Sequence, residues 1–234
     1  MLLCMKRIML AASALLAAAP AVAADRRFTV TSFDRIQVEG PYEVVLATGR
    51  AGSVTASGTN LAIDRVSVEV QGRTLRIRPN RSAWGGYPGQ STGPVKLAVT
   101  THELSGAAVT GSGSLTVDRA KGLRFDLAVT GSGRIGIANV DADNLFVGLM
   151  GSGKISLAGK AKELTANIQG MGDLDAQKLT ADEAEIKADT AGTISLAVKR
   201  AAQITASGLG DTIITGKPAC TLKGQGAARV VCGS

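Results

Sequence analysis

The sequence predicts an all-β protein folded as a parallel β-solenoid with about 20 residues per coil. Three observations indicate this fold. The phrase Gly-Ser-Gly recurs at residues 111–113, 131–133 and 151–153, so the step between copies is constant. Each copy is followed by two apolar residues with one residue between them, which is the period of a β-strand. The 29 glycines and the low aromatic content of 3% also suit thin, regular layers built from small aliphatic side chains.

The N-terminus is typical of a secretory signal peptide. Lys6 and Arg7 precede an apolar run from Ile8 to Ala19, and Ala21-Val22-Ala23 offers a small-residue cleavage site. We therefore expect residues 1–24 to be removed, and the protein to be exported to the periplasm or the cell surface of a bacterium. No later apolar stretch reaches the length of about 18 residues that a membrane span needs, so we expect no transmembrane segment in the mature chain.

Residues 25–234 are predicted to form one β-solenoid domain. The region 28–70 fits the repeat less regularly, and we interpret it as two or three irregular N-terminal coils. Ile36 and Val38 precede Leu75 and Ile77 by close to two repeat steps. Because no linker rich in Pro or Ser follows this region, we do not expect it to be a separate domain.

The repeat extends beyond its three clearest copies. One and two repeat steps back from Leu115 lie Val95 and Leu75, and the forward steps reach Leu174 and Ile194. Parallel stacking of equivalent strands would place such residues in one inward column. The predicted column consists of Val95, Leu115, Ile135, Ile155, Leu174 and Ile194. Burial of each side chain contributes roughly 1.5–3 kcal/mol, although no single coil can bury its apolar face alone.

A second strand precedes each glycine corner. Its apolar residues alternate with polar ones, first at Phe125, Leu127 and Val129 and again one repeat later. Corners that stack on identical corners need positive φ and leave no room for a Cβ. The predicted structural corners are Gly111, Gly113, Gly131, Gly133, Gly151, Gly153, Gly170 and Gly172. Strands follow these glycines where a nucleotide-binding turn would need a helix, so we exclude that function.

The repeat breaks at residues 80–94, a loop rich in Gly and Pro. It contains Trp84, the only tryptophan of the chain, and Tyr87. Aromatic rings in such a loop could stack on a sugar or on a partner protein, which makes these two residues candidates for partner binding. The alternative is that they cover apolar surface on the side of the solenoid.

Two cysteines remain near the C-terminus after the predicted cleavage. Cys220 and Cys232 lie in strand-like segments, and in an oxidising compartment they predict a disulfide that staples the last coil. Such a bond contributes roughly 3 kcal/mol. The alternative is two free thiols. Two cysteines and the lone His102 are too few ligands for a metal site, and we expect no cofactor.

The formal charge of +7 falls to +5 when Lys6 and Arg7 are removed with the leader. The positive residues are dispersed along the chain, without the dense basic run that marks a nucleic-acid-binding protein. We therefore expect no nucleic-acid partner.

The N-terminal pattern Phe33-Asp34-x-Ile36-x-Val38-x-Gly40, followed by Tyr42-x-Val44 and by serial Gly-Ser-Gly corners, resembles the DUF2807 family. This family is also called the putative auto-transporter adhesin, head GIN domain. The resemblance covers residues 33–216 and implies a secreted or envelope protein with a single-stranded parallel β-helix. One departure is His102-Glu103, where members commonly have a proline before the equivalent of Leu104. The resemblance supplies no catalytic residues.

Two functions are compatible with these observations. The first is a non-enzymatic, adhesin-like or scaffolding module that binds a surface protein or a glycan. The alternative is a carbohydrate-active β-helix, a polysaccharide hydrolase or lyase, which would need Asp173, Asp175 and Asp211 to share a deep cleft with Arg or Lys. We predict no catalytic residue, and we expect His102 to be a turn residue because no nucleophile and orienting acid accompany it.

Overall fold

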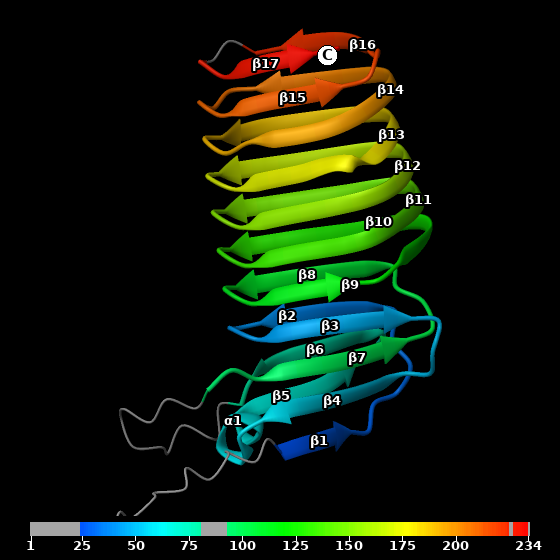
Figure 1. The fold of residues 1–234 in the computed structure, drawn as a ribbon, viewed down its shortest axis with the longest axis vertical. Helices are drawn as coiled ribbons and strands as arrows, with labels where there is room; N and C mark the ends of the chain where they lie inside the picture. The colour runs from blue at the N-terminus through cyan, green and yellow to red at the C-terminus, as the bar shows by residue number, and fades with distance from the viewer. Residues whose placement is uncertain (1–23, 81–92, 225–226, 234) are drawn as a thin grey trace, which may run out of the picture.

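The computed structural model describes residues 24–80, 93–224 and 227–233. These residues form one 17-stranded sheet that winds into a β-solenoid, with the C-terminus at one end of the long axis (Figure 1). The predicted all-β solenoid is confirmed, because equivalent residues of neighbouring coils pair with one another. Leu127, for example, pairs with Val147, and Arg134 with Lys154, which are the partners that the sequence repeat predicts.

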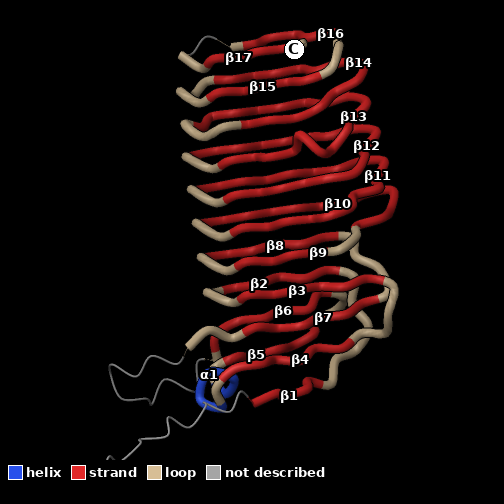
Figure 2. Tube along the Cα trace, in the orientation of Figure 1, coloured by secondary structure: helices blue, strands red, loops and turns tan. Residues whose placement is uncertain are grey.

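The C-terminal part of the solenoid consists of long strands that stack in parallel. They are β10 (Ala120–Gly131), β11 (Arg134–Gly151), β12 (Lys154–Gly170), β13 (Asp173–Thr190) and β14 (Ile194–Ala206). From β11 to β13, each strand runs from just after one corner to the next, so it follows nearly a whole coil (Figure 2). Near the corners, buried and outward-facing side chains alternate along these strands.

The predicted apolar column is confirmed from Leu115 onward. Each member pairs in parallel with the next, and every side chain is at most 1% exposed. The column runs through Leu115, Ile135, Ile155, Leu174 and Ile194. A second inward column lies on the strands before the corner and consists of Ile36, Ala107, Leu127, Val147, Ala166, Ile186 and Ile204. Together these columns form the core, and parallel pairing fixes their register.

The first coils do not stack in sequence order, so the apolar column predicted before Leu115 was wrong. The strands involved are β2 (Arg35–Glu39), β3 (Glu43–Thr48), β6 (Thr74–Pro79), β7 (Lys96–Thr101), β8 (Gly106–Gly111) and β9 (Ser114–Val117). Strand β2 pairs in parallel with both β6 and β8, and β3 pairs in parallel with both β7 and β9. The β2–β3 coil is therefore inserted between two coils that are later in the chain (Figure 1).

This insertion changes the column predicted before Leu115. Val44 of β3 lies between Leu115 and Leu97, so Leu97 takes the place predicted for Val95. Leu75 belongs to the other column, where it pairs with Ile36. The physical reason is that residues 35–48 are themselves a complete coil: their apolar residues alternate, and Gly40 supplies a corner at φ 103°.

The N-terminal end of the solenoid is antiparallel. The elements here are β1 (Ala24–Phe28), β4 (Ser53–Gly58), α1 (Asn60–Asp64) and β5 (Val66–Gln71). Strand β4 pairs antiparallel with β1 and β7, and β5 pairs antiparallel with β6. Thr59 caps α1 by accepting a hydrogen bond from the Ala62 N–H at 3.2 Å, and Ala62 and Ile63 are buried in the core. Within the described residues, no helix is long and apolar enough to cross a membrane.

The corners lie in line along one edge of the solenoid (Figure 2). Their first glycines have φ between 98° and 112°, at Gly111, Gly131, Gly151 and Gly170. The middle residue donates its backbone N–H to the carbonyl of the corner one coil earlier, as Ser152 does to Gly131 at 3.0 Å. Its side chain faces solvent, which explains why Met171 and Leu209, 68% and 74% exposed, can occupy this position.

The last coil consists of β15 (Asp211–Thr215), β16 (Ala219–Lys223) and β17 (Arg229–Cys232). Strand β16 pairs in parallel with β14, and β17 with β15. A disulfide joins Cys220 of β16 to Cys232 of β17, with 6.6 Å between their Cα atoms. The predicted staple of the terminal coil is therefore present in the structure.

Candidate functional site: an outward groove across the solenoid coils

A groove of about 330 Å³ lies on the outward face of the strands that precede the corner. It crosses β2, β8, β10, β11 and β12, which belong to successive coils. Its floor consists of outward positions with small side chains, Gly106, Ala108, Ala128 and Gly148. The inward neighbours of these residues are core residues, so the alternation of the strands holds the floor firmly in place.

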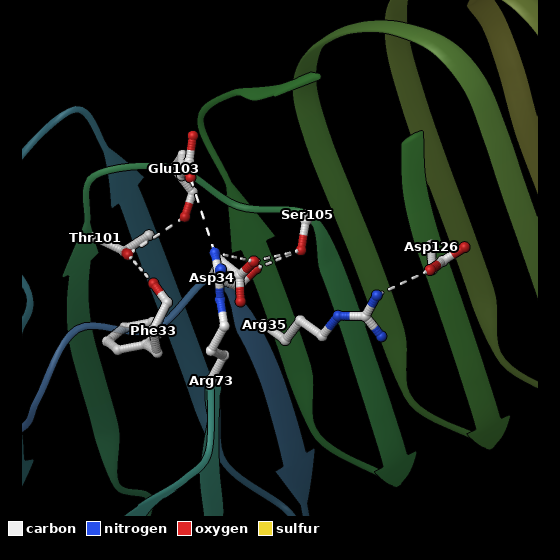
Figure 3. A network of polar contacts seen from close by, with 8 residues as sticks. All are labelled: Phe33, Asp34, Arg35, Arg73, Thr101, Glu103, Ser105 and Asp126. Atoms are coloured by element: carbon white, nitrogen blue, oxygen red, sulfur yellow. Dashed lines mark hydrogen bonds and ion pairs between the residues drawn. The ribbon is translucent and has the colours of Figure 1, made fainter. Parts of the chain in front are cut away.

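One wall of the groove is an ion pair that spans three strands. Arg35 of β2 extends across β8, and its Nη2 lies 3.3 Å from Oδ2 of Asp126 on β10 (Figure 3). Gly106 of β8 is in register with both residues. A Cβ on Gly106 would lie 3.6 Å from Cγ of Arg35 and 3.3 Å from the Asp126 carbonyl oxygen. The tighter of these contacts is with the backbone of β10, so glycine at this position relieves crowding between β8 and β10 beneath the arginine.

A second guanidinium, that of Arg124, lies behind this wall and contacts both Asp126 and the ring of Phe146. Arg124 donates from Nε to Oδ1 of Asp126 at 2.9 Å, so both carboxylate oxygens accept from an arginine. The Arg124 guanidinium also lies 4.1 Å from the centre of the Phe146 ring, a cation–π contact. Phe146 faces outward and lines the groove, whereas Phe125 and Tyr42 lie in the core.

Uncharged hydrogen-bonding groups complete the lining. They are Gln37 and Thr74 toward the N-terminal end of the solenoid, and Thr165 and Asn167 on β12. The next strand carries an ion pair between Glu185 and Lys187 at 2.8 Å, in register with Thr165 and Asn167. The hydrogen bond and the charge of Lys187 hold the pKa of Glu185 below its ordinary value.

A second polar network fixes the start of β2 beside the groove. Oδ2 of Asp34 accepts from Arg73 at 2.7 Å and from the Ser105 hydroxyl at 3.0 Å (Figure 3). The Thr101 hydroxyl donates to the Phe33 carbonyl at 2.6 Å. These contacts tie the inserted coil to the segments on both sides of it. They give Asp34, part of the N-terminal sequence pattern, a positioning role for Arg35.

The other residues singled out in the sequence lie elsewhere. Trp84 and Tyr87 fall outside the described residues, so their role in binding stays a prediction. His102 lies in a bend and its carbonyl accepts from the Gly49 N–H at 3.0 Å; its side chain lines a cleft of about 390 Å³ with Asp34 and Arg73.

The three aspartates of the enzyme alternative do not line the groove. Asp173 and Asp175 face outward at the start of β13, just after the corner. Asp211 lies on β15, and β14 separates it from Asp173. Oδ1 of Asp173 accepts from the Thr193 N–H at 2.8 Å. In the described part of the chain, no three His, Cys, Asp or Glu side chains are grouped closely enough to hold a metal ion.

Sequence reasoning missed the groove, although a signal for it was present. Ala108, Ala128 and Gly148 recur at the same step as the corners, at positions where an outward strand residue is usually larger and polar. Phe146 is an aromatic residue at an outward position of the same strand as Gly148. Both features become visible once the register between coils is known.

The fold defines a single-chain parallel β-solenoid whose outward face carries a binding-site-like groove. The chain belongs to the DUF2807 family, described as the putative auto-transporter adhesin, head GIN domain, whose model matches residues 32–218. This is a family of adhesin-like proteins and not a named enzyme family. A search of curated proteins found no match. Together with the disulfide, the family indicates an extracytoplasmic protein.

Solved structures share this architecture. A putative adhesin from Bacteroides fragilis NCTC 9343 has 20% sequence identity and a TM-score of 0.80, with 90% of this chain and 97% of that chain covered. A putative lipid binding protein from Parabacteroides distasonis ATCC 8503 has 22% identity and a TM-score of 0.69, with coverage of 91% and 98%. A putative adhesin from Parabacteroides merdae ATCC 43184 has 18% identity and a TM-score of 0.68, with coverage of 90% and 96%. At these identities the likeness concerns the fold.

Proposed function

We propose that this protein is a non-enzymatic, exported adhesin-like module that holds a ligand of a cell surface in the outward groove. The observation that carries the proposal is the groove itself. It combines a floor of glycine and alanine, an outward-facing aromatic ring and a wall of paired charges, on a scaffold whose register is fixed by parallel pairing. Concave sites that mix apolar surface with a few oriented polar groups are typical of ligand-binding sites.

The groove favours binding over cleavage. Hydrolysis of a glycosidic bond uses two carboxyl groups on either side of the bond. Asp126 supplies one carboxylate to the groove, and both of its oxygens accept hydrogen bonds from arginine. The polysaccharide hydrolase is therefore the weaker candidate, and the groove's chemistry favours recognition.

A pair of glycine variants tests the proposal. Gly148 lies on the groove floor, and a Cβ there would approach the Leu127 carbonyl oxygen no closer than 3.7 Å. Gly136, on the same strand but facing outward after the corner, has nothing within 4 Å of a Cβ. Gly148→Gln should fill the groove without strain, whereas Gly136→Gln should leave it open.

The measurement is binding of purified protein to a panel of immobilised surface polysaccharides and surface proteins. For at least one ligand, we expect the affinity to fall by about tenfold or more in Gly148→Gln and to be unchanged in Gly136→Gln. Trp84→Ala, measured beside them, tests the separate prediction for the 80–94 loop. Equal binding by the wild type and both glycine variants would contradict a site in the groove.

A further inference from the structure

We infer that the ligand of the groove is an uncharged carbohydrate chain that lies along the solenoid axis, across the coils of β2, β8, β10, β11 and β12. The inference rests on the proposed function and adds to it the chemical class and the direction of the ligand. Three features of the groove support it: the hydrogen bonding of the backbone beneath it, the ion pairs of its wall, and the direction of its apolar floor.

The backbone under the groove is fully engaged in the sheet. Strand β8 pairs with β2 and β10, β11 pairs with β10 and β12, and the remaining floor strands likewise have a partner on each side. An extended peptide that adds to a sheet needs a strand edge with unpaired N–H and C=O groups. Recognition on this face therefore depends on side chains. A ligand that carries donors and acceptors along its whole length, as a chain of sugar hydroxyls does, suits such a surface.

The charged side chains of the groove wall are already engaged with one another: Arg35 and Arg124 share the single carboxylate of Asp126. Beyond the C-terminal end of the groove, Glu185 pairs with Lys187 on the next strand. A charged ligand would have to compete with these partners. The other polar groups of the lining, including Gln37, Thr165 and Asn167, are amides and hydroxyls that bind hydroxyl groups without any net charge. The chemistry of the lining thus favours an uncharged ligand.

The apolar part of the groove has a direction. Ala108, Ala128 and Gly148 follow one another from coil to coil, so the floor runs along the solenoid axis and crosses the strands. From β2 to β12 the groove extends over about 19 Å, since neighbouring strands of a sheet lie about 4.8 Å apart. Phe146 stands beside this floor and offers part of its ring. A sugar chain has apolar C–H faces and hydroxyl edges. Its C–H faces fit against the floor and the Phe146 ring, and its hydroxyl edges fit against the charged wall and the amides.

The test uses uncharged oligosaccharides of glucose, mannose, xylose and N-acetylglucosamine, with oligogalacturonate and extended peptides as the charged and peptidic comparisons. Titration calorimetry on the full mature chain should detect binding of an uncharged oligosaccharide. Its affinity should fall about tenfold or more in Gly148→Gln and in Phe146→Ala, and should be unchanged in Gly136→Gln. Between about 0.05 M and about 0.5 M NaCl the affinity should change less than about twofold, since an uncharged ligand has no charge for the salt to screen.

The outcomes separate this inference from the proposed function. Groove-dependent binding of oligogalacturonate or of another anionic polymer, weakened by salt, would overturn the uncharged class while leaving the groove as the binding site. Groove-dependent binding of a peptide would overturn the carbohydrate class in the same way. If uncharged sugars still bind to Gly148→Gln, the groove is not the place where they bind, and that part of the inference would be overturned. If none of these probes and no member of the surface panel depended on Gly148, both proposals would fail.

Discussion

At the scale of single residues, small side chains perform two different tasks in this solenoid. At the corners, glycine is required because equivalent corners stack at backbone distance: a Cβ on Gly153 would lie 2.6 Å from the Gly133 carbonyl oxygen. On the outward face, Gly148 and Ala128 have ordinary surroundings, and their small size creates a groove. The first kind of glycine serves the fold, and the second serves the site.

The difference predicts opposite effects for two alanine substitutions. Gly153→Ala should lower the free energy of unfolding by about 1–3 kcal/mol, because backbone atoms of the neighbouring corner must move to admit the Cβ. In Gly136→Ala the added Cβ meets nothing within 4 Å, so the substitution should be neutral or raise the free energy of unfolding by up to about 1 kcal/mol, because alanine lowers the conformational entropy of the unfolded chain. Denaturant unfolding measures both. Equal stability of the two variants would show that corner stacking does not restrict Gly153.

At the scale of secondary-structure elements, the sequence predicted the regular coils but not the order in which all coils stack. From Leu115 to Ile194 the repeat step, the strand period and the chain order agree, so parallel register follows directly. Ile36 and Val38 have the same strand period, but a period does not say which neighbours a coil will have. The insertion of β2–β3 depends on contacts between segments far apart in sequence, such as Asp34 with Arg73 and Ser105.

The sequence contained a signal for the floor of the candidate site but not for its wall, for the same reason. Arg35, Asp126 and Phe146 come from three strands, and only the inserted position of β2 brings the first of them to the other two. An outward alanine or glycine in a single strand looks like any other surface position. Such residues indicate a groove only when several of them align across coils, and this alignment can be recognised only when the register between coils is known.

The inserted coil should behave as an interior part of the solenoid. We expect the amide protons of β2 and β3 to exchange as slowly as those of β10–β12, because each strand has a partner on both sides. The edge strand β1 should exchange faster. Gly40→Val, placed at φ 103°, should speed exchange in β2 and β3 and weaken binding in the groove that contains Arg35.

Hydrogen exchange followed by mass spectrometry measures these rates peptide by peptide. The matched control is Gly216→Val, which has nearly the same φ of 102° but lies between β15 and β16, beyond the C-terminal end of the groove. Exchange of β2 at the rate of β1 in the wild type would contradict the inserted position.

At the scale of the whole molecule, stability comes from contacts between neighbouring coils, and the two ends differ. In such an array each coil is stabilised chiefly by the coils above and below, so the ends are the first parts to open. Helix α1 and the antiparallel strands cover the N-terminal end, where Ile63 is buried. Among the described residues of the C-terminal end, β16 is exposed throughout and pairs with β14 alone. The disulfide between Cys220 and Cys232 therefore lies where the packing is weakest.

The effect of this bond should be confined to the end that it staples. Closing a loop of sequence separation 12 is worth about 3 kcal/mol by chain entropy. In the double variant Cys220→Ser, Cys232→Ser, we expect faster hydrogen exchange in β16 and β17. The main unfolding transition and binding in the groove should change little, because the groove ends at β12. Loss of groove binding together with the disulfide would show instead that the solenoid opens as one cooperative unit.

The state of the cysteines in the cell also tests export. If the leader is removed and the chain folds in an oxidising compartment, protein recovered from the envelope, unfolded without reduction, should show no free thiol. The chain has three cysteines, and Cys4 lies in the predicted leader, so a retained leader would add one labelled thiol and its own mass. Two labelled thiols on a chain of mature mass would mean that Cys220 and Cys232 are reduced, and the staple would then not operate in the cell.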